Sequence, residues 1–328
     1  MESNTAPLLE MRGIKKDFFG NQVLTDINFT LKAGEVLGLA GENGAGKSTL
    51  MKILFGMDVI RETGGYGGDV LINGEKVTFN TPFDALEAGI GMVHQEFSLI
   101  PGFTATENIL LNREPQKKNV ISEVFGPRLN TLDYKKMKTK AAEAIDKMGV
   151  EIDQNMVISD MPVGHKQFTE IARELSKDQL KLLILDEPTA VLTPQETDKL
   201  FQIMRNMKAD GKSLIIITHK LHEVLDVSDR VAVLRKGEYI GDVATKDADQ
   251  QSLTDMMVGH SVSLNIDRPD PVNVTPRLVL DGLTVFDELG VKRLDNVSFT
   301  VNAGEVLGVA GVAGSGQREL LESIAGLS

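Results

Sequence analysis

Three runs of consecutive apolar residues organise the chain, and each one ends in polar residues. They are Val36–Ala40, Leu182–Leu185 and Leu214–Ile217. Runs without polar alternation are typical of strands that are buried on both faces of a parallel sheet. Ligands gather at the carboxyl ends of such strands, so the polar residues that follow each run are candidates for chemistry.

Shorter patterns surround these strands. Residues 8–31 contain two strand patterns on either side of a turn predicted at Phe19–Gln22, with Phe18 and Phe19 at that turn. Two more strand patterns, at 231–234 and 238–241, predict a strand pair. A region rich in Lys and Ala, from about Thr131 to Met148, predicts a helix.

The first apolar run leads into a glycine-rich segment and then into the apolar pattern of a helix. The segment is Gly41-Glu42-Asn43-Gly44-Ala45-Gly46-Lys47-Ser48-Thr49. Its spacing, Gly-x-x-x-x-Gly-Lys-Ser between strand and helix, is that of a phosphate-binding loop, in which backbone N–H groups surround a polyphosphate. Lys47 is expected to neutralise the β- and γ-phosphates and Ser48 to ligate magnesium. The alternative is a glycine-rich turn with a chance lysine, against which the full spacing in this context argues.

The other two apolar runs end in ionisable side chains. Asp186 and Glu187 directly follow the second run. His219 follows the third run, after Thr218. Asp186 is expected to hold magnesium through water, Glu187 to polarise the attacking water as a general base, and His219 to reach the γ-phosphate. The alternatives are a solvated strand end for the two carboxylates and a structural role for the histidine.

Composition narrows the class of protein. The chain has 328 residues, no cysteine and a formal net charge of −12, so disulfides and thiolate metal sites are excluded. No basic cluster indicates nucleic acid as a partner. We expect no secretory signal at residues 1–5 and no run of about 20 apolar residues for a membrane span. The prediction is a cytoplasmic protein whose membrane role, if any, depends on a partner.

A repeat divides the chain. Residues 297–311 restate residues 27–41 at a shift of 270 positions, which indicates a duplicated domain. We expect a first nucleotide-binding domain at 1–264, a linker at 265–277 and the start of a second domain at 278–328.

The second copy of the phosphate loop is degenerate. Gln317 stands where the first copy has Lys47, and Arg318 stands where it has Ser48. Backbone N–H groups can still hold phosphates there, but catalysis is expected to be poor. The copy has no counterparts of the later buried strands within these 328 residues, so we expect it not to complete a sheet of its own.

Taken together, these motifs resemble those of the ATP-binding cassette (ABC) ATPases of transporters over essentially the whole chain. The phosphate loop, Gln95 at the Q-loop, Asp186-Glu187-Pro188-Thr189 at Walker B and His219 at the switch histidine all match. The residues alone leave Phe18 and Phe19 evenly divided between core and base stacking, but Phe18 matches the family's adenine-stacking aromatic. The resemblance implies an α/β P-loop NTPase fold, with a mainly parallel central sheet, an antiparallel β subdomain and a helical subdomain.

The resemblance also implies ATP and Mg²⁺ as ligands. It places catalysis on Lys47, Gln95, Glu187 and His219. It places magnesium on Ser48, Gln95 and Asp186. It places the nucleotide on Phe18, Gly41, Asn43, Gly44, Ala45, Gly46, Lys47, Ser48 and Thr49.

Within that family the chain looks most like the tandem-cassette ATPases of bacterial monosaccharide and nucleoside importers. Residues 91–95, 186–196 and 253–259 look closest to the nucleoside-importing branch. This implies membrane permease subunits, contacted through residues 97–108, an extracytoplasmic substrate-binding protein and a second ABC domain, in cis or by dimerisation. It also implies a peripheral position at the cytoplasmic face of the cell membrane.

Two departures from the family pattern bear on mechanism. The signature usually written Leu-Ser-Gly-Gly-Gln is here Met161-Pro162-Val163-Gly164-His165, which leaves Gly164 as the backbone donor, and Thr193 stands where aspartate is common. In a head-to-tail cassette dimer this signature faces the degenerate loop around Gln317. We therefore expect an asymmetric ATPase with one working site and one structural site.

Two other functions stay open at this stage. One is a soluble, non-transport cassette ATPase acting on ribosomes or DNA, against which the acidic charge argues. The other is a truncated partner that binds nucleotide but hydrolyses it poorly.

Overall fold

The computed structural model describes residues 6–118, 130–261, 274–287, 290–311 and 314–327. They fall into two compact units, one within residues 1–262 and the other within 263–328. Residues 265–273, most of the expected linker, lie outside the described residues, and the first strand of the second unit begins at Pro276, inside the range expected for the linker. In the described parts of the chain, no helix combines the length and the apolar character needed to cross a membrane.

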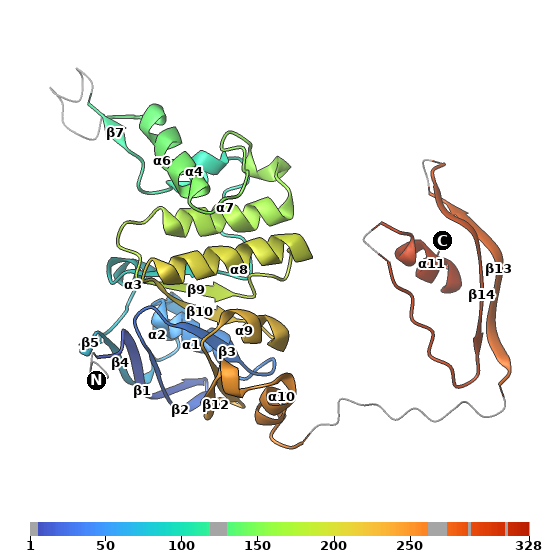
Figure 1. Ribbon diagram of the computed structural model, residues 1–328, viewed down its shortest axis with the longest axis horizontal. Helices are drawn as coiled ribbons and strands as arrows, with labels where there is room; N and C mark the ends of the chain where they lie inside the picture. Colours follow the sequence, from blue (N-terminus) through green and yellow to red (C-terminus); the bar gives the residue numbers. More distant parts are fainter. Residues whose placement is uncertain (1–5, 119–129, 262–273, 288–289, 312–313, 328) are drawn as a thin grey trace. The chain divides into compact units, whose positions relative to one another are not determined.

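A six-stranded sheet forms the centre of the first unit (Figure 1). Its strands are β3 (Val36–Ala40), β6 (Ile90–Val93), β9 (Leu182–Asp186), β10 (Ser213–Ile217), β11 (Arg230–Arg235) and β12 (Glu238–Ala244). The order is β12-β11-β3-β10-β9-β6, and every neighbouring pair is parallel except β11 with β12. The three apolar runs are therefore adjacent central strands, as their lack of polar alternation predicts.

Alternate residues of these strands supply two separate cores. Leu182 and Ile184 of β9 belong to a core shared with the antiparallel sheet, whereas Leu183 and Leu185 belong to a core shared with the helical layer. Each of these four leucine and isoleucine side chains is almost completely buried. Burial on both faces fixes the register of the strand, because a slip by one residue would exchange the two sets.

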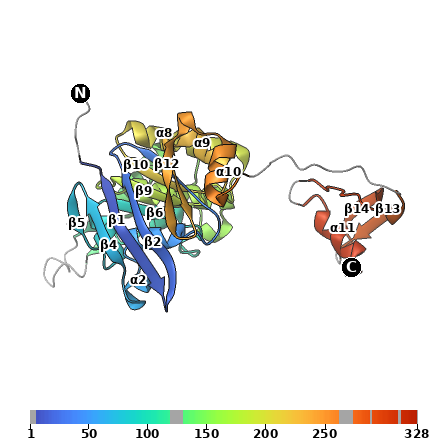
Figure 2. The same ribbon diagram turned by 90° about the horizontal axis from the view of Figure 1, so that it is seen from below.

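An antiparallel sheet of order β2-β1-β4-β5 covers one face of the unit (Figure 2). Its strands are β1 (Leu9–Phe18), β2 (Asn21–Leu31), β4 (Gly67–Ile72) and β5 (Glu75–Val77). The turn between β1 and β2 contains only Phe19 and Gly20, because Phe18 pairs with Asn21. The expected turn at Phe19–Gln22, with Phe18 inside it, was therefore too long.

Helices cover the remaining surfaces, and Figure 1 shows α4, α6 and α7 together at the end away from the antiparallel sheet. The helices of this unit are α1 (Lys47–Leu54), α2 (Asp58–Glu62), α3 (Pro82–Glu87), α4 (Ala105–Ile109), α6 (Tyr134–Asp146), α7 (Val163–Leu175), α8 (Pro194–Ala209), α9 (Leu221–Val227) and α10 (Gln250–Val258). Two 3₁₀ turns lie at Ile158–Asp160 and Thr245–Asp247.

The helix expected from Thr131 is shorter than predicted. Thr131 and Leu132 form strand β8 (Thr131–Leu132), which pairs with β7 (Gln116–Lys117), and α6 begins only at Tyr134. The side chain of Asp133 caps α6 by accepting the backbone N–H of Lys136. Such a cap requires non-helical backbone at the capping residue, so the helix cannot extend back to Thr131.

Thr193, which replaces the common aspartate, has a clear local role. It is the N-cap of α8 and forms a capping box in which its hydroxyl accepts the N–H of Glu196. The carboxylate of Glu196 in turn accepts the N–H and the hydroxyl of Thr193, each at 2.8 Å. Threonine serves here as a helix cap, a role for which aspartate is also preferred.

The second unit consists of a two-stranded antiparallel sheet and one helix. Its elements are β13 (Pro276–Phe286), β14 (Lys292–Asn302) and α11 (Gln317–Ile324). Residues 306–310, which repeat the sequence of β3, form no strand, and the side chain of Val306 is 85% exposed. In the first unit β3 pairs with β10 on one side and β11 on the other. Among the described residues of the second unit only β13 and β14 are paired, and the repeated segment pairs with no strand there.

Candidate functional site

A cavity of about 330 Å³ opens where the carboxyl ends of the central strands meet the glycine-rich loop. Its lining residues are Val23, Asn43, Gly44, Ala45, Gly46, Lys47, Ser48, Thr49, Gln95, Asp186, Glu187, Ala190, Ile217 and His219. The fold thus brings almost all of the expected site residues into one space, although they span nearly 180 positions of sequence. Of the expected set, Phe18 and Gly41 do not line this cavity.

Lys47 is held by the loop that contains it. Its buried ammonium donates to the carbonyl oxygens of Gly41 at 2.6 Å and Glu42 at 3.0 Å. Burial lowers the pKa of Lys47, while the carboxylates of Glu187 and Asp186 act in the opposite direction. The loop therefore fixes a cation at the base of the cavity, where α1 begins after the left-handed Gly46.

The two carboxylates at the end of β9 differ in environment. Asp186 is nearly buried, and burial is the largest cause of its raised pKa; the Glu187 carboxylate raises it further, and Lys47 lowers it. Glu187 has a backbone φ of +49°, a left-handed conformation that is uncommon for a residue with a Cβ. Its N–H donates to the carbonyl oxygen of Ile217 at 2.8 Å, which ties the end of β9 to the end of β10. Strained backbone of this kind is concentrated at functional sites.

His219 completes this group. Its Nδ1 lies 3.0 Å from a carboxylate oxygen of Glu187, and the tautomer that carries a proton on Nδ1 donates it to that oxygen. The imidazole is largely exposed at the mouth of the site, whereas the Glu187 carboxylate is mostly covered. This carboxylate and imidazole share the cavity with the Lys47 ammonium. Such a pair can accept and position protons on a substrate in the cavity.

The oxygen donors of the cavity fit a magnesium ion that is shared with phosphates. The Ser48 hydroxyl, the Gln95 amide and the Asp186 carboxylate line the same space, and all are hard ligands of the kind that Mg²⁺ prefers. Within the described residues, no group of three or more His, Asp and Glu side chains could hold a metal by itself. Magnesium typically takes one or two carboxylates and completes its shell with water and substrate phosphates, which agrees with this sparse set.

Phe18 lies outside the cavity, at the end of β1. It is half-buried against the core, and the Lys16 ammonium lies 4.6 Å from the centre of its ring. Phe19, in contrast, is 92% exposed. The lining residue nearest to Phe18 along the chain is Val23 of β2. No motif marked Val23, Ala190 or Ile217, because apolar residues in a strand or loop have no signature of their own.

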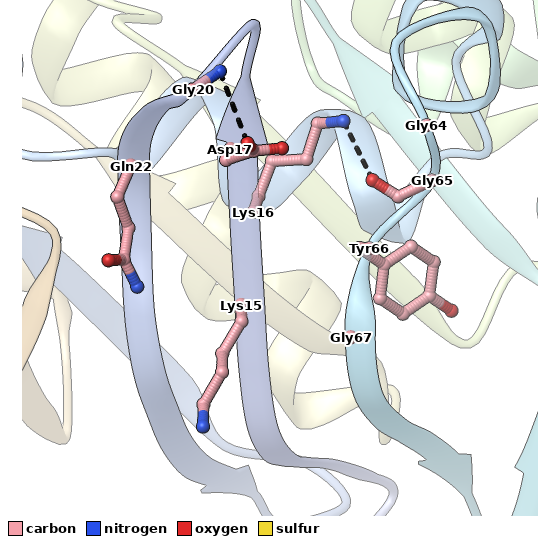
Figure 3. Close-up of a pocket in the computed structure, with 9 residues that line it drawn as sticks. All are labelled: Lys15, Lys16, Asp17, Gly20, Gln22, Gly64, Gly65, Tyr66 and Gly67. Carbon is pink, nitrogen blue, oxygen red and sulfur yellow. Dashed lines mark hydrogen bonds between the residues drawn. The ribbon is translucent and has the colours of Figure 1, made fainter.

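A second cavity, of about 340 Å³, lies beside the β1–β2 hairpin (Figure 3). Its lining residues are Lys15, Lys16, Asp17, Gly20, Gln22, Gly64, Gly65, Tyr66 and Gly67. The buried Lys16 ammonium donates to the carbonyl oxygens of Ile60, Thr63 and Gly65, at 3.3, 2.8 and 2.7 Å. These three bonds use all three of its donors, so Lys16 fixes the neighbouring loop and has none left for a ligand.

Side chains hold the backbone of the loop after Gln95. Glu170 of α7 accepts the N–H of Ser98 at 2.5 Å, and Arg173, one turn later, donates to the carbonyl oxygen of Ser98 at 3.0 Å. Asn108 of α4 binds both backbone groups of Ile100, at 2.7 Å and 3.2 Å. The loop is thereby attached to the helical layer. Asn108 is completely buried, so the surface expected over residues 97–108 ends before it.

The signature-like segment lies at the start of α7. Met161 and Gly164 are buried, and Val163 is exposed. A Cβ placed on Gly164 would lie 2.1 Å from Oε1 of Glu196, so the α8 cap packs directly against this glycine. Only glycine fits at this position without displacing the carboxylate that caps α8.

Comparison with known proteins agrees with this geometry. The ABC transporter family model matches residues 24–190. The chain is 42% identical to the glucose import ATP-binding protein TsgD13 of Haloferax volcanii, over 98% of the chain and 60% of that relative. It is also 42% identical to the guanosine import ATP-binding protein NupO of Bacillus subtilis, over 98% of the chain and 59% of that relative. The chain therefore spans about 60% of the length of these curated relatives.

A solved structure shows the same fold. The ADP conformation of MJ1267, an ATP-binding cassette of an ABC transporter, matches with a TM-score of 0.63 at 22% identity, over 78% of this chain and 100% of that one. The predicted fold, a mainly parallel sheet with an antiparallel β subdomain and a helical subdomain, is confirmed.

Proposed function

This chain belongs to the ABC transporter family of ATP-binding cassettes, and from that premise we propose that it is the ATP-binding and ATP-hydrolysing subunit of an importer for nucleosides or simple sugars. The observation that carries the proposal is the contact of Glu187 with His219, 3.0 Å apart in the cavity that also contains Lys47. A general base, a polar partner and a phosphate-binding cation in one space are the components of phosphoryl transfer to water.

Each of these side chains has a separate task. Lys47 and the N–H groups of the glycine-rich loop bind the phosphates of ATP. Glu187 accepts a proton from the attacking water, and His219 holds that carboxylate and reaches the γ-phosphate. Ser48, Gln95 and Asp186 would hold a magnesium ion, which would supply positive charge to the phosphate oxygens.

The names of the relatives support import as the coupled process. TsgD13 and NupO are named as ATP-binding proteins for glucose and guanosine import. We therefore infer a peripheral position at the cytoplasmic face of the membrane, with permease subunits as direct partners and an extracytoplasmic substrate-binding protein as an indirect one. Exposed Ile100 and Phe103, on the loop held by α4 and α7, are suited to contact the permease.

The proposed ATPase is asymmetric. The first phosphate loop has Lys47 and Ser48, whereas the second has Gln317 and Arg318 at the same places. A working site needs the signature of a second ABC domain, supplied in cis or by dimerisation, to close over Lys47. The 328 residues by themselves are expected to bind Mg-ATP and to hydrolyse it slowly.

The test measures ATP binding and phosphate release on the same preparation at several protein concentrations. Lys47→Ala should abolish binding, because the cation at the base of the cavity is lost. Slow release that is independent of concentration is the expected result for the unaltered chain. A brisk rate that rises with concentration and disappears in Glu187→Gln would contradict slow hydrolysis and indicate homodimers formed through residues 161–165. No ATP binding at all would overturn the proposed function.

A further inference from the structure

Two threonines that flank the Glu187–His219 pair share one buried carboxylate. Thr189 follows Glu187 by two residues, and Thr218 directly precedes His219. Both hydroxyls donate to the same oxygen of Glu223, at 2.7 Å from Thr189 and 3.3 Å from Thr218. Exposure is 2% for Glu223, 1% for Thr189 and 0% for Thr218, so water does not compete for these bonds.

The charge of Glu223 is compensated locally. Lys220 lies 3.0 Å from its other oxygen and also reaches the hydroxyl of Thr189 at 3.3 Å. The backbone N–H of Lys220 donates to the hydroxyl of Thr218 at 3.1 Å, so that hydroxyl both accepts and donates. A buried carboxylate is tolerated when its oxygens are paired in this way, and removal of a partner then costs more than the bond itself.

These bonds connect the loop after β9 to the loop after β10. The N–H of Glu187 also joins this region by donating to the carbonyl oxygen of Ile217, but that bond fixes the backbone at the strand ends only. The Lys220 ammonium reaches the carbonyl oxygen and the hydroxyl of Thr189, at 3.4 and 3.3 Å. The orientation of each loop beyond its strand depends on what holds Thr189 and Thr218. Glu223, from the first turn of α9, accepts from both hydroxyls and also pairs with Lys220, which contacts the same two threonines.

We propose that Glu223 is a positioning residue for ATP hydrolysis, which sets the Glu187–His219 contact by holding Thr189 and Thr218 together. This inference rests on the proposed function of the site. Glu223 does not line the nucleotide cavity, so it acts through the other residues and not on the substrate. Its loss should therefore reduce turnover while ATP binding persists.

The experiment uses matched pairs of variants in the full chain. Glu223→Leu and Thr218→Val remove the acceptor and one donor, whereas Glu223→Gln and Thr218→Ser keep an oxygen at the same place. Asp226→Asn, an exposed acid on the same helix, is the control. The first readout is the imidazole signal of His219 in ¹⁵N-histidine NMR spectra, which is practicable because the chain has five histidines.

The His219 signal should move in the Leu and Val variants and stay in place in the Gln, Ser and Asn variants. Single-turnover hydrolysis should fall on the order of tenfold or more in the Leu and Val variants, with ATP affinity changed by less than about twofold. If the wild-type chain does not bind ATP, the proposed function fails, and the NMR readout, which needs no nucleotide, still tests the positioning.

Two results would overturn the inference. One is an unchanged His219 signal in Glu223→Leu and Thr218→Val. The other is a Gln or Ser variant as impaired as its apolar counterpart, which would assign the effect to packing in the Ser variant and to the lost charge pairing with Lys220 in the Gln variant. Thr189→Val removes the second hydroxyl and gives the same test where Thr218→Val does not fold; an unchanged His219 signal in that variant contradicts the proposal.

Discussion

The Nδ1 atom of His219 lies 3.0 Å from the carboxylate of Glu187, across the ends of two adjacent parallel strands. The last residue of β9, Asp186, is in register with Ile217 of β10, so the residues that follow each strand emerge side by side. The left-handed backbone of Glu187 then turns its carboxylate towards the imidazole. Sheet register and one unusual backbone conformation thus both contribute to this contact.

Glu187→Gln tests the general base directly. The amide keeps the shape and the contact with His219 but cannot accept a proton from water. Hydrolysis should fall by about a hundredfold or more, with ATP affinity kept. Phosphate release and equilibrium binding of a fluorescent ATP analogue measure the two quantities. The substitution Glu238→Gln, at an exposed residue, serves as the control. An equal loss of hydrolysis in both variants would show that Glu187 is not the general base.

Phe18 and Phe19 give a matched pair for the adenine contact. Phe18 is half-buried with a cation near its ring, and Phe19 is 92% exposed. If Phe18 stacks on the base, Phe18→Ala should weaken ATP binding about tenfold, since base stacking on an aromatic contributes about 1–3 kcal/mol. Phe19→Ala should have little effect, and inorganic tripolyphosphate should bind both variants equally. Loss of ATP affinity in Phe19→Ala alone would reverse the assignment.

Gly41 and Gly44 test two different constraints on the phosphate loop, which are close packing against β11 and left-handed backbone. A Cβ on Gly41 would lie 2.4 Å from the carbonyl oxygen of Leu234 in β11, whereas a Cβ on Gly44 meets nothing within 4 Å. Gly44→Ala should lower the free energy of unfolding by only about 1–2 kcal/mol, which is the strain of an alanine in left-handed backbone. Gly41→Ala should cost more, because the loop must move away from β11. Urea unfolding gives both free energies, and equal values would contradict this account.

The elements that the sequence predicts well are those that local pattern determines. The runs that became β3, β9 and β10 have no polar alternation, and the spacing around Lys47 has a single established geometry. The repeat shows the limit of such patterns. Residues 306–310 repeat the β3 sequence and yet form no strand, because a parallel strand exists only with its neighbours.

The parts that could not be predicted depend on contacts between distant segments. Glu223 binds Thr189 across 34 positions, and Glu170 binds Ser98 across 72, with no local motif to announce either bond. The helix α6 begins later than its composition predicts, because Asp133 prefers to cap a helix and not to continue one. Local sequence predicts a turn at Phe18, whereas its pairing with Asn21 depends on the register of the whole hairpin.

Glu170 makes the stability of the protein depend on pH. It is completely buried, and Oε2 has no hydrogen-bond partner among the described residues. Burial raises the pKa of Glu170 to about 7, against the opposing effects of the Ser98 N–H and of Arg173. Because the pKa is higher in the folded protein than in the unfolded chain, the folded protein binds the proton more tightly. The resulting stability is complete below the unfolded pKa and is lost as pH rises through about 7.

Glu170→Gln should therefore stabilise the protein at high pH. The amide oxygen still accepts the Ser98 N–H, and no charge remains to be buried. The gain in unfolding free energy over wild type should grow from pH 5 to pH 8.5 and approach at most about 3 kcal/mol. The contribution of the ion pair between Glu170 and Arg173, which the amide removes, is subtracted from this gain. Chemical unfolding across this pH range measures the gain, with the exposed Glu143→Gln of α6 as the control. A gain that does not change with pH would mean that Glu170 stays in one protonation state, and the burial argument would fail.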